Sequence, residues 1–106
     1  MKHTPIEEIF SSKGKVKILK ILALEGELNI SEIARRAELN HSSTLAHLKS
    51  LESIGIVEEK TFGRIRIFRF KEEDPRAKAI KQLFEAFIKL ESEAKEENEK
   101  DEEDSS

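Results

Sequence analysis

The chain has 106 residues, 37% of them hydrophobic and 39% charged, which fits one domain with a modest core that pairing with a second copy would stabilise. It contains no cysteine, which excludes disulfides, thiolate metal sites and cysteine nucleophiles. No apolar run approaches the ~20 residues that span a membrane, and the acidic start MKHTPIEEIF does not suit a signal peptide, so we expect a cytoplasmic protein.

The formal net charge of -3 hides an uneven distribution. Residues 1–71 carry 13 Lys or Arg against 9 Asp or Glu, whereas residues 72–106 carry 6 against 13. The first part is therefore basic and only the second is acidic, so the total charge does not argue against a polyanionic partner. The high charge content, with one Gln and three Asn, is typical of proteins from organisms that live at high temperature.

Two helices are predicted in the first quarter of the chain. Thr4-Pro5 opens a short helix over Ile6–Phe10, with Thr4 as its cap and the proline at the first helical position. Ser12 then caps a second helix over Lys13–Glu25, whose wide apolar stripe predicts a central place in the core. A glycine ends this helix, and residues 28–30 are predicted as a very short strand.

The segment 30–57 is predicted to form two short helices joined by a tight turn over residues 38–40. We expect Ser31 to cap the first helix, and Asn40 or Ser42 the second, because a short side-chain oxygen can accept a hydrogen bond from a free backbone N–H. The inward residues of both helices recur at helical spacing, and they are Ile30, Ile33, Ala34, Ala37, Thr44, Leu45, Leu48 and Leu51.

The outward face of the second helix is small, polar and nearly free of acidic residues, whereas a helix that only covers a core more often shows Glu and Lys there. Small hydroxyl side chains let the backbone approach another surface, and they donate hydrogen bonds to phosphates or base edges. We interpret this face as DNA-binding, and the alternative is a plain helical hairpin with a serine-rich surface. The face consists of Ser42, Ser43, Ala46, Ser50 and Ser53, flanked by His47 and Lys49.

A β-hairpin is predicted next, with strands over Ile56–Lys60 and Arg64–Phe70. The turn between them is Thr61-Phe62-Gly63, where the glycine suits a position that needs a positive φ. The second strand, RIRIFRF, changes from arginine to phenylalanine along one face. This change predicts a hairpin whose base packs on the body while its tip extends into solvent.

The arginines of the second strand have two interpretations. Arg64 and Arg66 would form a basic finger beside a DNA groove, where each cation neutralises phosphate charge. The alternative for these residues and for Arg69 is a cross-strand ion pair with Glu58 or Glu59 of the first strand.

A long last helix over residues 75–97 begins after an Asp74 cap. Its apolar residues recur seven apart, which fits an a/d seam of two to three heptads. The helix outlasts any surface that a domain of this size offers, so we favour a symmetric dimer contact over packing on its own domain. Residues 98–106 form an acidic tail that we expect to be disordered. The predicted dimer residues are Ile6, Phe10, Ile80, Leu83, Phe84, Phe87 and Leu90.

This order of elements is that of a winged helix-turn-helix domain, and the expected fold class is α+β, mainly helical. The run HSSTLAHLKSLESIGIV, followed by FGRIRIFRF, resembles the recognition helix and wing of ArsR-type transcription regulators, a group broad in archaea and bacteria. The resemblance implies a DNA-binding domain over residues 1–74, a dimerisation helix over 75–97 and a tail over 98–106. It also implies a homodimer that sets two recognition helices in successive major grooves of double-stranded DNA, with wing arginines on a neighbouring groove or the backbone.

By position, the resemblance assigns the DNA contacts to the second helix and the wing. Metal-sensing members of the group use cysteine thiolates, which are absent here, and the only histidines, His3, His41 and His47, have no carboxylate partners at ligand spacing. We therefore expect no metal site, no cofactor and no enzyme activity. The predicted DNA-binding residues are Ser42, Ser43, Ala46, His47, Lys49, Ser50, Arg64 and Arg66.

The function expected from these features is a sequence-specific DNA-binding transcription regulator, a repressor, that acts as a homodimer. One alternative is a protein–protein adaptor on the same scaffold, with the last helix and the acidic tail as its partner surface. A second alternative is a nucleoid-type protein that coats DNA without sequence preference.

Overall fold

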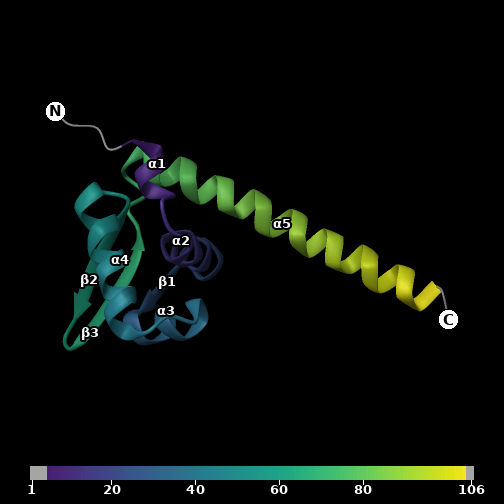
Figure 1. Ribbon diagram of the computed structural model, residues 1–106, viewed down its shortest axis with the longest axis horizontal. Helices are drawn as coiled ribbons and strands as arrows, with labels where there is room; N and C mark the ends of the chain where they lie inside the picture. Colours follow the sequence, from purple (N-terminus) through teal and green to yellow (C-terminus); the bar gives the residue numbers. More distant parts are fainter. Residues whose placement is uncertain (1–4, 105–106) are drawn as a thin grey trace.

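The computed structural model describes residues 5–104, and side chains over 5–97 (Figure 1). Within this part of the chain, no helix has the length and apolar character needed to cross a membrane. Short helices surround a small antiparallel sheet, and one long helix follows, so the predicted fold class is confirmed. The elements are α1 (Ile6–Ile9), α2 (Lys13–Glu25), β1 (Glu27–Asn29), α3 (Ile30–Ala37), α4 (His41–Ile54), β2 (Val57–Phe62), β3 (Ile65–Phe70) and α5 (Pro75–Asp104).

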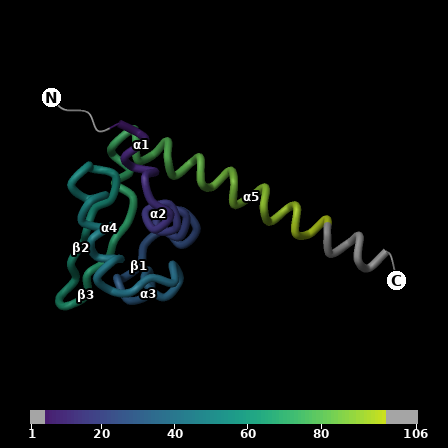
Figure 2. Tube along the Cα trace, in the orientation of Figure 1, coloured from purple at the N-terminus to yellow at the C-terminus, as the bar shows by residue number. Residues whose placement is uncertain are grey.

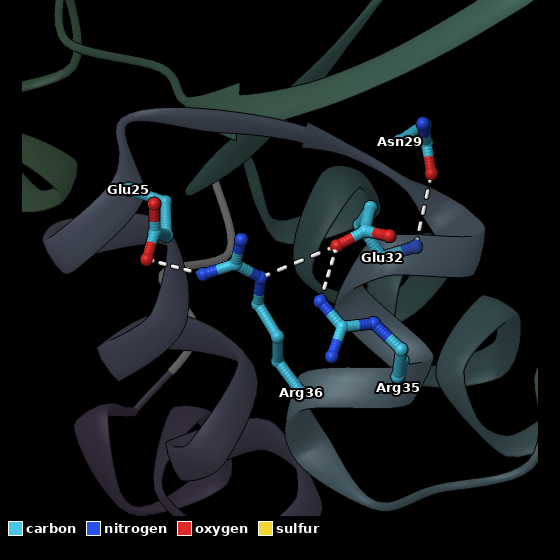
Figure 3. Close-up of polar contacts among 5 residues, drawn as sticks. All are labelled: Glu25, Asn29, Glu32, Arg35 and Arg36. Atoms are coloured by element: carbon cyan, nitrogen blue, oxygen red, sulfur yellow. Dashed lines mark hydrogen bonds and ion pairs between the residues drawn. The ribbon is translucent and has the colours of Figure 1, made fainter.

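Side-chain caps fix where three of the helices begin. Ser12 accepts a hydrogen bond from the backbone N–H of Lys15 at the start of α2, as predicted. Asn40 caps α4 by accepting from the N–H of Ser43 at 2.8 Å. The cap of α3 is Asn29 and not the predicted Ser31, because the asparagine oxygen reaches the Glu32 N–H at 2.9 Å and the helix already includes residue 30 (Figure 3).

The N-terminal helix α1 begins at Ile6 as predicted but ends at Ile9, one residue before the predicted end. Pro5 stands in extended conformation just before the helix instead of at its first position, and it provides no side-chain cap. The predicted cap, Thr4, and the N-terminal His3 lie outside the described residues. Of this short helix, Ile9 is buried in the core, while Ile6 is exposed.

Ion pairs connect α3 to the end of α2. Glu32 accepts from Arg35 at 2.7 Å and from Arg36 at 3.5 Å, and Arg36 also pairs with Glu25 of α2 (Figure 3). The hydrogen bond and charge of Arg35 lower the pKa of Glu32 below its ordinary value. The two helices are therefore joined by charges at their surface as well as by apolar packing between them.

The three strands form one antiparallel sheet in the order β1-β3-β2. Phe62 pairs with Ile65, so the turn is Gly63-Arg64. The strand β2 reaches two residues further toward the tip than predicted, whereas β3 begins one residue later than predicted. Gly63 has a φ of 62°, which suits the first central position of a two-residue hairpin turn. The predicted three-residue turn is wrong because the cross-strand pair of Phe62 and Ile65 continues the ladder.

The core lies around α2, which contacts α3, α4 and α5 (Figure 1). The hairpin base packs into it, since Phe68 and Phe70 are buried, as the arginine-to-phenylalanine change predicts. Thr44 is also fully buried, and its hydroxyl donates to the Asn40 carbonyl at 2.9 Å, which satisfies the polar atom within the helix.

The long helix α5 divides its apolar residues between two surfaces. Ile80 and Phe84, predicted for the dimer seam, are buried in this protomer's own core, and the Phe84 ring lies 6.1 Å from that of Phe10. A strict seven-residue repeat does not distinguish these neighbouring faces of a helix, and the side of α5 nearest α2 takes the two residues. Leu83, Phe87 and Leu90 remain exposed on the adjacent side.

The helix α5 extends to Asp104, past the predicted end at residue 97. Glutamate and lysine have high helix propensity, and neither glycine nor proline interrupts the segment. The division into domain, dimerisation helix and tail stays a prediction, and residues 105–106 lie outside the described residues. Beyond the core, the later turns of α5 project away from the hairpin side of the domain (Figure 2).

Candidate nucleic-acid interface

Helix α4 presents the polar face that its sequence predicts. Its inward residues Thr44, Leu48 and Leu51 are buried, which fixes the rotation of the helix about its axis. The opposite side therefore lies at the surface: Ser42, Ala46, Lys49 and Ser53 are exposed, and Ser43 and Ser50 are half-buried. The face carries hydroxyl groups and one lysine within reach of an approaching surface.

His47 is not on an open flank of α4, because its ring packs on Gly14 of α2. A Cβ atom at position 14 would lie 2.5 Å from Nε2 and 2.8 Å from Cδ2 of His47, closer than such contacts allow. The absence of a side chain at Gly14 thus permits a close approach of α2 to α4. A glycine inside a strongly predicted helix was the signal in the sequence, since glycine lowers helix stability unless packing requires it.

A shallow depression separates the hairpin tip from the starts of α3 and α4. His41, at the first position of α4, is exposed at its rim. Two wing arginines and the first residues of α3 and α4 line the same space. The lining residues are Asn29, Ile30, Ser31, His41, Arg64, Ile65 and Arg66.

The cations Lys49 of α4 and Arg66 of β3 share one carboxylate, that of Glu59 in β2. Lys49 Nζ lies 3.3 Å from Glu59 Oε2, and Arg66 donates to Glu59 through Nε at 2.5 Å and through Nη2 at 3.3 Å. The Arg66 hydrogen bond, followed by that of Lys49, holds the pKa of Glu59 below its ordinary value. The cross-strand ion pair, one of the two interpretations of Arg66, is therefore present.

The other wing arginines differ from Arg66. Arg69 donates to Glu58 at 2.8 Å and lies 3.6 Å from Glu27, so it connects all three strands. Arg64 is exposed in the turn, and it has no ion pair among the residues that the structure describes. Of the three wing arginines, Arg64 is thus the one that is available to a phosphate without breaking an ion pair between described residues.

The hairpin tip also carries apolar surface that the sequence interpretation missed. Phe62 and Ile65 are directly paired across the strands, and both are more than half exposed. The prediction placed Phe62 in the turn, where its exposure would need no explanation. The signal in the sequence was Thr61-Phe62, two residues of high strand propensity that extend the first strand past its predicted end at Lys60.

The chain is similar to known proteins in sequence. Residues 12–59 match the model of the bacterial regulatory protein family arsR. The chain is 32% identical over 79 residues to a cadmium resistance transcriptional regulatory protein CadC homolog of Staphylococcus aureus. The match covers 74% of this chain and 61% of that protein, so the chain spans about three fifths of the relative's length.

Solved structures show the same fold. The homodimeric winged helix-turn-helix DNA-binding domain of Mb0332 from Mycobacterium bovis is 25% identical, with a TM-score of 0.63 over 88% of this chain and 80% of that one. HlyU from Vibrio cholerae is 22% identical, with a TM-score of 0.66 over 77% and 86% of the two chains. The predicted resemblance to ArsR-type winged helix-turn-helix regulators is confirmed by the family match.

Proposed function

Because this chain carries an ArsR-type winged helix-turn-helix domain, we propose that it is a sequence-specific DNA-binding repressor that acts as a homodimer. In this proposal α4 enters the major groove, and the wing lies on the adjacent groove or the backbone. Repression would follow from occupation of an operator, which blocks access to the same DNA. The proposal needs no cofactor.

The observation that carries the proposal is the polar outward face of α4 beside an arginine-tipped wing. The buried Leu48 and Leu51 hold α4 so that its serines point outward, where small side chains permit close approach to base edges. Arg64 stands free at the tip of the wing that flanks this helix. The domain thus presents on one side a helix that can contact base edges and a cation that can contact phosphates.

The homodimer rests on the exposed apolar side of α5. Leu83, Phe87 and Leu90 lie one helical turn apart and are all exposed in the protomer. A contiguous apolar surface of this kind is unfavourable in water, and a second copy would cover it through a self-complementary contact. The relative from Mycobacterium bovis is described as homodimeric. Two copies would set their α4 helices on half-sites about 34 Å apart.

The test is selection of bound sequences from random duplexes, followed by gel-shift titration at several salt concentrations. We expect a palindromic consensus. We expect the double variant Lys49→Ala with Arg64→Ala to lose affinity and to lower the salt slope by about 2, because each phosphate contact contributes about 0.9. The matched control removes two exposed lysines of α5, Lys78 and Lys89, and should leave both quantities unchanged.

Two results would contradict the proposal. Equal affinity and equal salt slope for the wild type and the α4–wing variant would exclude this binding mode. Absence of binding to any duplex at low salt would exclude DNA as the partner and would favour the adaptor function.

A further inference from the structure

We propose that Glu59 is an internal competitor for DNA phosphate, which lowers affinity for non-specific DNA and so increases discrimination of the operator. This inference rests on the proposed function. In the free protein, Glu59 occupies the two cations that flank the recognition surface, Lys49 of α4 and Arg66 of the wing. DNA must displace this carboxylate before either cation can neutralise a phosphate.

The geometry of the cluster suits such an exchange. Glu59 lies on the face of β2 that is directed at α4, and both of its oxygens are in use: Oε1 accepts from Arg66, and Oε2 faces Lys49 at 3.3 Å. The Glu59 side chain is 17% exposed, whereas the Lys49 and Arg66 side chains are 49% and 42% exposed. The carboxylate is therefore fixed beneath two cations that can turn outward.

A second carboxylate completes the neutralisation. Glu52, one turn after Lys49 on α4, has an oxygen 3.6 Å from the lysine nitrogen. Two cations thus face two carboxylates, and the cluster carries no net charge in the free protein. Non-specific binding depends almost wholly on neutralisation of phosphates by free cations, so a cluster without net charge contributes little to it.

Operator DNA differs from random DNA in the hydrogen bonds that it offers to α4. Base contacts from the serine face would hold the helix in the groove, and the phosphates would then lie next to Lys49 and Arg66. Exposed ion pairs are weak, so close phosphates can replace Glu59 at small cost. On random DNA, without base contacts to hold α4 in the groove, Lys49 and Arg66 stay paired with Glu59, whereas on the operator they are released to the phosphates. Removal of Glu59 therefore strengthens binding to random DNA more than binding to the operator.

The neighbouring Glu58 offers a matched control. It lies on the same strand with its side chain 20% exposed, and it also holds an arginine of β3, at 2.8 Å. Its partner, however, is Arg69, on the opposite face of the hairpin and tied to Glu27. Glu58→Gln therefore removes the same charge from the same strand without releasing a cation beside α4.

The experiment measures dissociation constants of the full-length wild type, Glu59→Gln and Glu58→Gln for a random duplex and for the selected operator, each over a series of salt concentrations. We expect Glu59→Gln to tighten binding to the random duplex on the order of tenfold and to steepen its salt slope by about 1 to 2. Operator affinity should increase less, so the ratio of the two affinities falls. Glu58→Gln should change each value less than about twofold.

A second variant and a folding control complete the design. Glu52→Gln should shift random-duplex affinity in the same direction as Glu59→Gln but by less, because its oxygen is further from Lys49. Thermal unfolding followed by circular dichroism verifies that each variant folds.

The possible outcomes separate the two proposals. Equal values for Glu59→Gln and Glu58→Gln, or weaker random-duplex binding by Glu59→Gln, would overturn this inference while operator selection by the wild type still stands. No binding by any of the proteins would overturn the proposed function and this inference together.

Discussion

His47 and Gly14 illustrate how one side chain can serve both packing and recognition. The imidazole belongs to α4, the proposed reading helix, yet it packs on the backbone of α2 at position 14. Its orientation is therefore set by a helix that does not itself enter the groove. A substitution at Gly14 would therefore alter DNA affinity only by displacing the His47 ring.

We expect Gly14→Ala to change DNA binding more than it changes stability. Alanine in a helix interior is favoured over glycine by about 0.5–1 kcal/mol, which offsets the loss of packing when the half-buried ring swings away. Operator affinity should fall as far as it does in His47→Ala, and the double variant should fall no further. Gel-shift titration and urea unfolding of the three variants measure both effects, and additive losses of affinity would contradict the coupling.

Individual residues show which contacts a sequence can predict. The Ser12 and Asn40 caps depend on atoms three residues apart, so local pattern suffices for them. The partner of Arg66 depends on strand register and on the distance of α4 from β2, which no local pattern contains. For the same reason the sequence predicted Lys49 only as a DNA-binding residue, although the fold brings Glu59 beside it.

The start of α5 is joined to the end of α4 by one arginine. Arg76 donates to Asp74 through Nη2 at 2.7 Å and to the Ile54 carbonyl at 2.9 Å. The carboxylate also accepts from the backbone N–H of Arg76 at 2.8 Å, so Asp74 caps α5 while it holds the link between the helices. This arginine contact lowers the pKa of Asp74 to about 2.

Asp74→Asn should therefore destabilise the protein in a pH-dependent way. The folded pKa lies below the ordinary value of 3.8, so the stabilisation by the carboxylate is complete above about pH 5 and is lost as the pH falls toward 2. We expect the variant to lose about 1 kcal/mol at pH 7 and to approach the wild type below pH 3. Urea unfolding between pH 7 and pH 2 tests this, with Glu73→Gln as the control, and a loss independent of pH would contradict it.

The order and type of the elements can be predicted from the sequence because each element has a strong hydrophobic periodicity and recognisable cap or turn residues at its ends. The assignment of α5 surfaces does not, since Ile80 and Phe87 occupy the same heptad position but different environments. The difference arises because α2 lies along one side of α5, where Ile80 and Phe84 pack, and this contact extends as far as the Lys20–Glu91 ion pair. Residues on the adjacent side keep the same apolar pattern but remain exposed in the protomer.

The exposed apolar residues on α5 relate the proposed dimer contact to the affinity for operator DNA. If two copies join through this side, each protomer presents one α4 helix, and binding of the first half-site raises the effective concentration of the second. Loss of the contact would then lower operator affinity without altering any DNA-contacting residue. The surfaces proposed for pairing and for recognition lie on opposite sides of α2, with α5 on one side and the α4–hairpin surface on the other (Figure 1).

Phe87→Glu tests this arrangement. The Phe87 side chain is 56% exposed, so its replacement leaves the protomer core intact, whereas a charge in a paired apolar surface is unfavourable. We expect a dimer for the wild type and a monomer for the variant in sedimentation experiments, with operator affinity reduced by about 100-fold. Gln82→Glu introduces the same charge at an exposed position elsewhere on the helix and should leave the dimer unchanged. A monomeric wild type with full operator affinity would show that each protomer acts alone, whereas a dimeric Phe87→Glu would move the contact to another surface.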